Sequence, residues 1–339
     1  MYDQMMPNGV MAVGLPFLKM DKNASKRKMS EFINLFSPTY TVVQVPLREL
    51  IKCCVRAKTS TFVMIADSFS GTGLRGLIWC KLFALLLNSP YVEVVSNHNY
   101  PASLLLQRFG VYRHKIIPWD HAWDLNSYKF EAKVLNKDRK IWNFFYAGRV
   151  LKEKGVGDII KAVALLKEKG IDSNAVIAGY GDIAYFKNQA AVLNISEIIT
   201  FLGNVPHDKV ISCMRDSDVV IVPSRINASE GMPCTIYESY IVKTPLVLSD
   251  HPMFKTAIKN GVFFKAGNAK SLAQALNLLM NNAGLYNELS KGADSALKKL
   301  IVPNSFIDII THWLSGTASD KEWLLKHSLQ KANKDIRNI

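Results

Sequence analysis

The sequence lacks the features of membrane-spanning and disulfide-stabilised proteins. No run of about 18 apolar residues occurs, and the most apolar helix-like stretch, Leu74 to Leu87, contains Arg75 and Lys81 and is too short to cross a bilayer. The start, MYDQMMPNG, does not follow the basic-then-apolar order of a secretory signal. The five cysteines show neither metal-ligand spacing nor a disulfide framework. We therefore expect a folded protein of the reducing cytoplasm.

Acidic residues are also scarce, because 28 Asp and Glu stand against 42 Lys and Arg in 339 residues. Residues 1–140 hold 19 of the basic and 10 of the acidic residues, so the basic excess is denser there. A local cluster consists of Lys19, Lys22, Lys26, Arg27 and Lys28. Such a cluster attracts anionic lipid, phosphates or nucleic acid, and the alternative is a solvated loop that only aids solubility. No recognition motif or interleaving of aromatic and basic residues supports nucleic-acid binding.

The second half of the chain alternates short β-rich runs with helix-like segments. The predicted strands are Ile141–Ala147, Ala175–Ala178, Ile198–Leu202, Val219–Val222, Leu246–Leu248 and Val262–Phe264. Strands separated by helices imply right-handed crossovers and a parallel sheet that is covered on both faces. Ligands of such sheets bind at the carboxyl ends of the strands.

The first half shows the same pattern less clearly. Its predicted strands are Gly9–Leu15, Tyr40–Val45, Thr61–Ala66, Tyr91–Ser96 and Lys115–Ile117. The length favours two domains, so we expect an α/β protein with two doubly wound, Rossmann-like domains facing each other across a cleft. The expected divisions are an acceptor-side domain at 1–125, a linker at 126–140, a donor-binding domain at 141–314, and a tail at 315–339 that crosses back to the first domain.

Two carboxylates stand out in the segment SEGMPCTIYESY, residues 229–240. Glu230 lies in a loop after a predicted strand, and a helix is expected to begin near Pro233, a favourable first-turn residue. Glu238 follows inside that helix. Free amides at the helix start favour a phosphate, and the two carboxylates can accept hydrogen bonds from sugar hydroxyls. Taken alone, the pair is more typical of two solvated acids.

Upstream lies FFYAGRVLKEKG, in which a predicted strand ends at Gly148 and is followed by Arg149 and Lys154. Two cations in a glycine-flanked turn suit a diphosphate, since arginine offers a planar fork and lysine a point charge. The segment IAGYGD places Gly179 and Gly181 at another strand end.

Taken in order, these motifs resemble those of the retaining nucleotide-sugar glycosyltransferases of family 4, which have the GT-B fold. The resemblance runs through AGRVLKEKG, IAGYGD, FLGNVPHDKV, SDVVIVPS, EGMPCTIYE and TPLVLSD, and covers residues 141–314. It implies that Arg149 and Lys154 bind the donor diphosphate, Glu230 the donor sugar, Glu238 the ribose and the backbone of Val205 the nucleobase. The Gly179–Gly181 turn would line the cleft, and Gly231, Met232 and Pro233 belong to the same donor site.

Many family members also have a histidine at a strand end that faces the reaction centre, and His98 in VEVVSNHNYP is the best candidate here. Its alternative is a loop histidine. The catalytic candidates are thus Glu230, Arg149, Lys154 and His98. Asp216 and Asp218 spell a D-x-D motif, but they directly precede the buried run VVIVPS, so we expect them to end a helix and enter a strand. No metal and no other cofactor is expected.

The resemblance implies transfer with retention of configuration, in which cations stabilise the departing diphosphate. The basic first domain suggests a lipid-linked glycan as acceptor, as in the assembly of surface polysaccharide, with the enzyme peripheral at the inner face of the cell membrane. An oligosaccharide acceptor, a nucleotide-sugar epimerase of the same fold and a non-catalytic subunit of a glycan-assembly complex are the alternatives.

Overall fold

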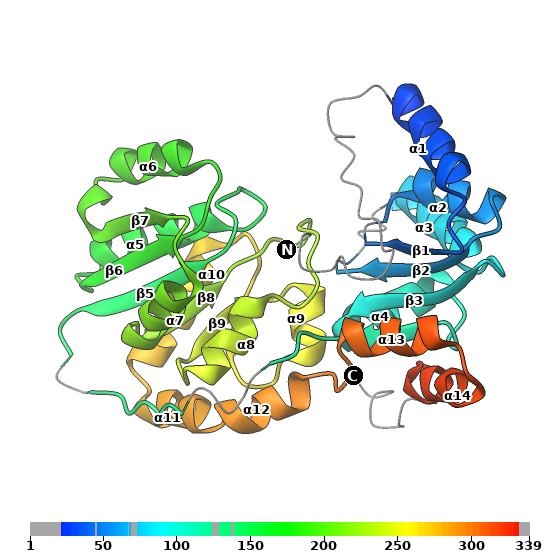
Figure 1. The fold of residues 1–339 in the computed structure, drawn as a ribbon. Coiled ribbons are helices and arrows are strands. Elements are labelled where there is room, and N and C mark those ends of the chain that lie inside the picture. The colour runs from blue at the N-terminus through cyan, green and yellow to red at the C-terminus, as the bar shows by residue number, and fades with distance from the viewer. Residues whose placement is uncertain are drawn as a thin grey trace.

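A computed structural model describes residues 22–44, 46–66, 68, 73–123, 129–136 and 139–331. It contains two α/β domains, each with its own parallel sheet, which confirms the predicted architecture (Figure 1). The predicted strand at Gly9–Leu15 and Lys19 lie outside the described residues, as do the side chains of Lys22 and Lys26. Arg27 and Lys28 are exposed on the first helix.

The sheet of the first domain is parallel, with the order β1-β2-β3-β4. Its strands are β1 (Tyr40–Val43), β2 (Ser60–Ile65), β3 (Val92–His98) and β4 (Ile116–Trp119). One face is covered by α1 (Lys22–Phe36), α2 (Arg48–Arg56), α3 (Gly73–Leu87) and α4 (Asn99–Phe109). Because successive strands are added in one direction, right-handed crossovers place the connecting helices α2, α3 and α4 on the same face, and α1, which precedes β1, packs beside them.

The opposite face is covered by two helices from the end of the chain, α13 (Phe306–Ser315) and α14 (Ala318–His327). Ile309 and Trp313 of α13 are buried against Phe62, Ile117 and other apolar side chains of the sheet. Trp313 also donates from Nε1 to Glu93 Oε2 at 2.7 Å. The chain therefore returns to the first domain before α13, earlier than the predicted boundary at residue 315, because the apolar side of α13 belongs to the first core.

The sheet of the second domain has the order β10-β9-β8-β5-β6-β7, so its direction reverses at β5. Its strands are β5 (Trp142–Ala147), β6 (Ser173–Ala178), β7 (Ile199–Gly203), β8 (Val219–Val222), β9 (Leu246–Ser249) and β10 (Val262–Phe264). This reversal makes the domain doubly wound. Successive side chains of a strand point to opposite faces, so Phe144 and Phe145 enter the two different cores.

The helices of the second domain divide between those cores. One face receives α5 (Val156–Glu168), α6 (Ile183–Val192), α10 (Ala269–Met280) and α11 (Ala283–Lys291). The other receives α7 (His207–Asp216), α8 (Cys234–Ile241), α9 (Pro252–Ala257) and α12 (Ala293–Leu300), and a short 3-10 turn (Ser196–Ile198) precedes β7. Within the described ranges, no helix combines the length and apolar character needed to span a bilayer.

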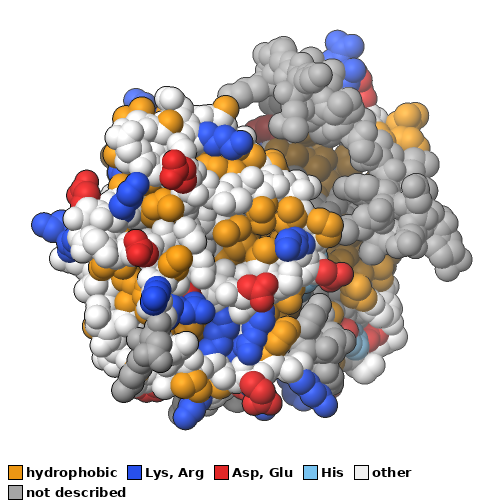
Figure 2. All heavy atoms as spheres, turned by 90° about the vertical axis from the view of Figure 1, so that its left-hand side faces the viewer, with side chains coloured by type: hydrophobic (Ala, Val, Ile, Leu, Met, Phe, Trp, Pro, Cys, Tyr) orange, Lys and Arg blue, Asp and Glu red, His pale blue; other side chains and the backbone are white. Residues whose placement is uncertain are grey.

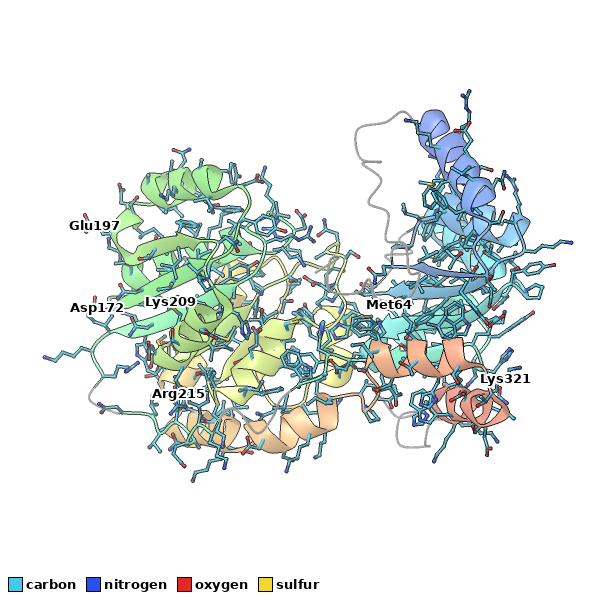
Figure 3. All side chains as sticks on the ribbon, viewed as in Figure 1. Met64, Asp172, Glu197, Lys209, Arg215 and Lys321 are labelled. Carbon is cyan, nitrogen blue, oxygen red and sulfur yellow. The ribbon has the colours of Figure 1, made fainter. Side chains whose placement is uncertain are left out.

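The predicted linker lies against the second domain where it is described. The backbone amides of Lys133 and Leu135 donate to Ser290 and Asn287, and Arg139 forms an ion pair with Asp218. Figure 2 looks onto the side of the second domain that faces away from the first, where Lys and Arg side chains gather on the lower half. Asp172 and Glu197 lie on that far side, whereas Met64 lies near the first domain's boundary with the second (Figure 3).

Candidate functional site

The carboxyl ends of β5 and β8 form the switch point of the second sheet, because these two strands pair directly while their loops lead to opposite faces. The loops are tied together. Arg225, after β8, donates to both carboxylate oxygens of Asp158 in the first turn of α5, at 2.7 and 3.0 Å. Its backbone amide also donates to the carbonyl oxygen of Glu153 at 2.8 Å. The two loops therefore form one structural unit.

Glu230 lies at the centre of this unit, in the loop after β8, and its side chain is buried. Its Oε1 accepts hydrogen bonds from Lys154 Nζ at 2.6 Å and from Ser224 Oγ at 2.5 Å. Lys154 comes from the loop after β5, so this ion pair bridges the switch point. Both donors contact Oε1, so they fix the orientation of the carboxylate, and Oε2 takes part in neither contact.

Glycines bring the carboxyl ends of β5 and β6 together. A Cβ on Gly179 would lie 1.8 Å from the carbonyl oxygen of Gly148, so no side chain fits there, and Gly179 has a φ of +134°. Arg149 follows Gly148, and its carbonyl oxygen accepts a hydrogen bond from Tyr146 Oη at 2.7 Å. The backbone of the turn is thereby fixed, while the Arg149 side chain is exposed and accessible to an anion.

Glu238 lies in α8 and is buried next to the loop that follows β7. Burial raises its pKa, and the contact of its Oε1 with His207 Nε2 at 2.9 Å acts in the opposite direction. His207 stands two residues after Val205, at the start of α7. The structure therefore joins Glu238 to the start of α7, two residues after Val205.

The two domains meet directly at this loop. A Cβ on Gly231 would lie 2.2 Å from the carbonyl oxygen of Ala66, just after β2, so only glycine permits the approach. The backbone amide of Ser68 donates to the carbonyl oxygen of Glu230 at 2.9 Å. In return, Ser68 Oγ accepts from the amide of Glu230 at 3.1 Å, and Ser229 Oγ donates to the carbonyl oxygen of Ser68 at 2.8 Å. Backbone contacts thus place the carboxyl end of β2 against Glu230.

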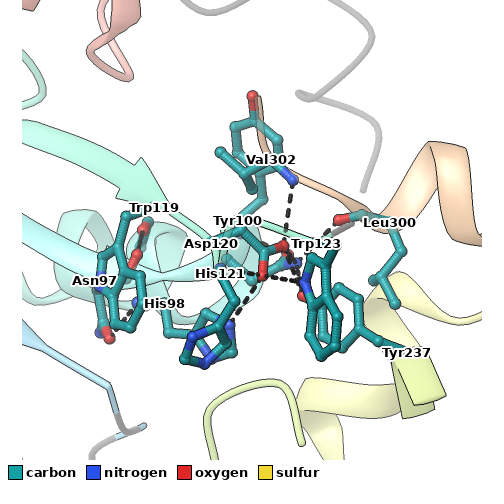
Figure 4. Close-up of polar contacts among 12 residues, drawn as sticks. Asn97, His98, Tyr100, Trp119, Asp120, His121, Trp123, Tyr237, Leu300 and Val302 are labelled. Carbon is teal, nitrogen blue, oxygen red and sulfur yellow. Dashed lines mark hydrogen bonds and ion pairs between the residues drawn. The ribbon is translucent and has the colours of Figure 1, made fainter. Parts of the chain in front are cut away.

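A second contact between the domains centres on Asp120, which directly follows β4 and is completely buried (Figure 4). From the second domain it receives a hydrogen bond from Tyr237 Oη at 2.8 Å, and from the returning chain one from the amide of Val302 at 3.2 Å. Trp123, three residues further along the chain, donates from Nε1 to Asp120 Oδ1 at 3.0 Å. Burial opposes the ionisation of Asp120, but hydrogen bonds from His98, Trp123 and Tyr237 outweigh it and lower the pKa.

His98, the last residue of β3, is buried beside this carboxylate, with Nε2 at 3.2 Å from Asp120 Oδ1. An ionised carboxylate only accepts hydrogen bonds, so the geometry assigns the proton to Nε2. Nδ1 then faces the other way, 3.4 Å from the point where a Cβ on Gly231 would stand. His98 therefore presents a hydrogen-bond acceptor to the Glu230–Gly231 loop when its ring is neutral.

The structure brings four of the predicted residues together at the facing strand ends. Lys154 contacts Glu230, and Gly231 is the next residue of the chain. His98 approaches Gly231 from the first domain. Met232 is buried, and Pro233 is the N-cap of α8, close to the predicted helix start. Asp216 ends α7 and Asp218 precedes β8, as predicted, so both lie at the amino end of that strand, opposite the cleft.

Sequence reasoning missed four residues that order the site: Ser68, Asp120, Ser224 and His207. Ser224, Asp120 and Ser68 each follow the carboxyl end of a strand, which is the one signal that could have found them. A single polar residue at such a place is too common to be selected without knowing which strand ends face each other.

The sequence profile of the family described as glycosyl transferases group 1 matches residues 127–296. The amylovoran biosynthesis glycosyltransferase AmsK of Erwinia amylovora is 27% identical over 155 residues, 44% of this chain and 38% of that relative. The N,N'-diacetylbacillosaminyl-diphospho-undecaprenol alpha-1,3-N-acetylgalactosaminyltransferase of Campylobacter jejuni is 29% identical over 164 residues, 48% of this chain and 41% of that relative. The chain thus spans about two fifths of the length of these two curated relatives.

Among solved structures, Anabaena Alr3699/HepE in complex with UDP-glucose superposes with a TM-score of 0.66 at 16% identity, covering 87% of this chain and 82% of that chain. At this identity the likeness shows the fold, which is the GT-B arrangement of two parallel-sheet α/β domains.

Replacing Asp120 by Asn tests the contact between the domains. The amide replaces one accepting oxygen by a donor, which leaves buried donors unpaired and removes charge-assisted bonds, so we expect unfolding to become easier by about 2 kcal/mol or more. Because the folded pKa of Asp120 is lowered, its stabilising effect is complete above the unfolded value of about 3.9 and is lost as the pH falls through the folded pKa.

Urea unfolding at neutral pH and at a series of pH values falling from about 4 measures this difference, which should shrink as the pH passes through the folded pKa. The exposed Asp172→Asn exchange is the control and should change neither curve. An Asp120→Asn variant as stable as the wild type at neutral pH would contradict the role of this carboxylate.

Proposed function

The chain belongs to the glycosyl transferases group 1 family, and from this premise we propose that it transfers a sugar from a nucleotide-diphosphate sugar to an acceptor. The observation that carries the proposal is the Lys154–Glu230 ion pair across the switch point of the second sheet. It joins a cation suited to a diphosphate with a carboxylate suited to sugar hydroxyls, at the edge where such sheets bind ligands. A nucleotide sugar carries both groups in one molecule.

Within this proposal, Arg149 and Lys154 bind the diphosphate, and Glu230 accepts hydrogen bonds from the donor sugar. The ammonium group of Lys154 contacts Glu230, so an arriving phosphate would compete with this carboxylate for it. Glu238 binds the ribose, and Val205 contacts the base through its backbone. These two assignments, to the ribose and to the base, are supported by the contact between Glu238 and His207, which links α8 to the loop of Val205. The segment Gly231–Pro233 leads into the start of α8, and the Gly179–Gly181 turn borders Arg149.

We propose that transfer retains the anomeric configuration, as the family resemblance implies. The bond between the anomeric carbon and the diphosphate oxygen breaks, and the charge that develops on the phosphate is stabilised by Arg149 and Lys154. The acceptor hydroxyl attacks the same face of the sugar and gives its proton to the departing phosphate oxygen. His98, held by Asp120, offers Nδ1 as an acceptor for a sugar hydroxyl at the Gly231 side. NMR of the anomeric proton in the product checks retention.

We propose a lipid-linked glycan as the acceptor and the inner face of the cell membrane as the place of reaction. The Campylobacter jejuni relative is named for an undecaprenol-linked diphospho-sugar acceptor, and the Erwinia amylovora relative for amylovoran biosynthesis. The basic excess in residues 1–140 fits an anionic surface. Incubation with the donor alone separates transfer from epimerisation, because an epimerase converts the donor without an acceptor.

Exchanging Arg149 or Lys154 for Ala should weaken binding of the nucleoside diphosphate. Each exchange removes a charge-assisted contact worth about 1.5–3 kcal/mol, or roughly 10- to 150-fold in affinity. Calorimetry with UDP, GDP and ADP measures the loss, and the exposed Lys161→Ala exchange on α5 is the matched control. Unchanged affinity in both variants would remove these cations from the site.

Activity should survive EDTA, because we propose that protein cations take the place of a metal ion at the diphosphate. The assay follows sugar transfer before and after chelation. Complete loss, with recovery on adding Mn²⁺ or Mg²⁺, would show that a carboxylate site for a metal ion exists.

Exchanging Glu238 for Gln should lower the affinity for the nucleotide without lowering the stability of the fold. Since burial raises the folded pKa of Glu238, its charge costs stability above that pKa, and the cost disappears below the unfolded value of about 4.3. The Gln variant should therefore be at least as stable as the wild type at pH 7 and equal to it at low pH. Nucleotide affinity should nevertheless fall about tenfold or more with the lost contact to the ribose. If the Gln variant is less stable than the wild type at pH 7 but binds the nucleotide normally, Glu238 stabilises the fold and does not bind the ribose.

A further inference from the structure

The helix α3 has large apolar residues on every side, although it lies at the surface of the first domain. One side packs into the core through Phe83, Ala84 and Leu87. The other side leaves large apolar side chains exposed: Leu74, Leu77, Ile78, Leu82 and Leu85. Leu74 is 75% and Leu85 is 69% exposed. Contiguous exposed apolar side chains of this kind mark a surface that contacts another apolar phase.

The helical spacing places these side chains in one stripe. Leu74, Ile78, Leu82 and Leu85 follow one another at intervals of four, four and three residues, which is one face of an α-helix. Lys81 lies within the stripe, but its Nζ extends toward the C-terminus of α4, 3.8 Å from where a Cβ on Gly110 would stand. The ammonium thus lies beside the stripe, in the way that lysine keeps its charge in water at an apolar surface.

The charge of the helices on this face of the sheet favours an anionic partner. The helices α1 to α4, which cover the same face of the first sheet, contain 10 Lys and Arg but only two acidic residues, Glu31 and Glu49. Glu31 is already paired with Arg27, and Glu49 with Lys52. A second copy of this chain would bring like charges together, whereas an anionic lipid surface accepts both the cations and the apolar side chains.

The start of α3 lies near the candidate site. Ser68, which bonds to the backbone of Glu230, precedes Gly73 by five residues, so the chain limits their separation to about 18 Å. Leu74, the most exposed apolar residue of α3, is therefore at the end of the helix nearer the cleft.

From these observations we propose that the exposed stripe of α3 inserts into the interface of an anionic lipid bilayer, with its Leu74 end beside the cleft. The stripe supplies the attraction that does not depend on salt, and Arg75 and Lys81 supply part of the attraction that does. Docking supplies a surface for the membrane location proposed above and does not itself require sugar transfer, but its use for presenting a lipid-linked acceptor to Glu230 rests on the proposed function.

The test is co-sedimentation of the full chain with vesicles of equal parts phosphatidylcholine and phosphatidylglycerol. The combined exchanges Leu74→Gln, Ile78→Gln, Leu82→Gln and Leu85→Gln should weaken binding at least tenfold, both at low salt and at about 1 M salt, where the Debye length is about 3 Å. Arg75→Gln with Lys81→Gln should weaken it at low salt only. Val192→Gln with Leu278→Gln, which alters exposed apolar residues of the second domain, is the matched control and should bind as the wild type does.

Binding of the stripe variant equal to that of the wild type overturns the proposal. Sedimentation showing a wild-type dimer that the stripe exchanges convert to a monomer, with vesicle binding unchanged, overturns it in favour of a contact between two copies. Nucleotide calorimetry on the same variants keeps the two proposals apart. The stripe variant should bind nucleotide normally. If the wild type binds vesicles but no nucleotide, the proposed function is wrong and the docking proposal still holds.

Discussion

Asp120 is a buried carboxylate that receives hydrogen bonds from both domains and from the segment that returns to the first domain, and the position of the cleft depends on it. Burying an unpaired charge would be very unfavourable, so Asp120 is compatible with the fold only when its donors are in place. Those donors include Tyr237 of α8 and the amide of Val302. Asn99 reinforces the arrangement by donating to Tyr237 Oη and to the carbonyl oxygen of Leu300. The relative placement of α8 and β4 is thereby defined by polar contacts with narrow geometric requirements.

The rest of the site follows from that placement. Glu238 is in the same helix as Tyr237, and Gly231 and Glu230 lie in the loop that leads into it. Fixing α8 against β4 consequently sets the distance between Glu230 and His98. The contacts of Ser68 with Glu230 are of another kind, because they involve backbone groups and one hydroxyl that water or a ligand can also satisfy. The contact between the domains thus depends on a charged group at Asp120 and on uncharged hydrogen bonds at Ser68.

The amino-acid pattern predicts the elements well where it has a clear physical cause. Apolar runs with turn residues at their ends locate β5 and β8, and the motifs place Lys154 and Glu230 in the loops after these two strands, but they do not predict the ion pair between the two side chains. The pattern does not say which sheet a helix covers, and so the boundary at residue 315 falls after α13 instead of before it. It also cannot distinguish an apolar helix that is buried from one like α3, since both have apolar residues on every side. Asp120 is out of reach for a similar reason, because its partners lie far apart in sequence.

Three of the acidic residues share one structural setting near the cleft. In a chain with an excess of 14 positive charges, Glu230, Glu238 and Asp120 are all buried at the facing carboxyl ends of the two sheets or in the helix beside them. Each has a nitrogen donor from a different segment: Lys154, His207 and His98. A carboxylate held in this way accepts hydrogen bonds in a fixed direction, which is what recognition of hydroxyl groups requires, while the surrounding cations attract a phosphate. Buried carboxylates beside an excess of cations therefore suit the proposed donor, which carries both hydroxyls and negative charge.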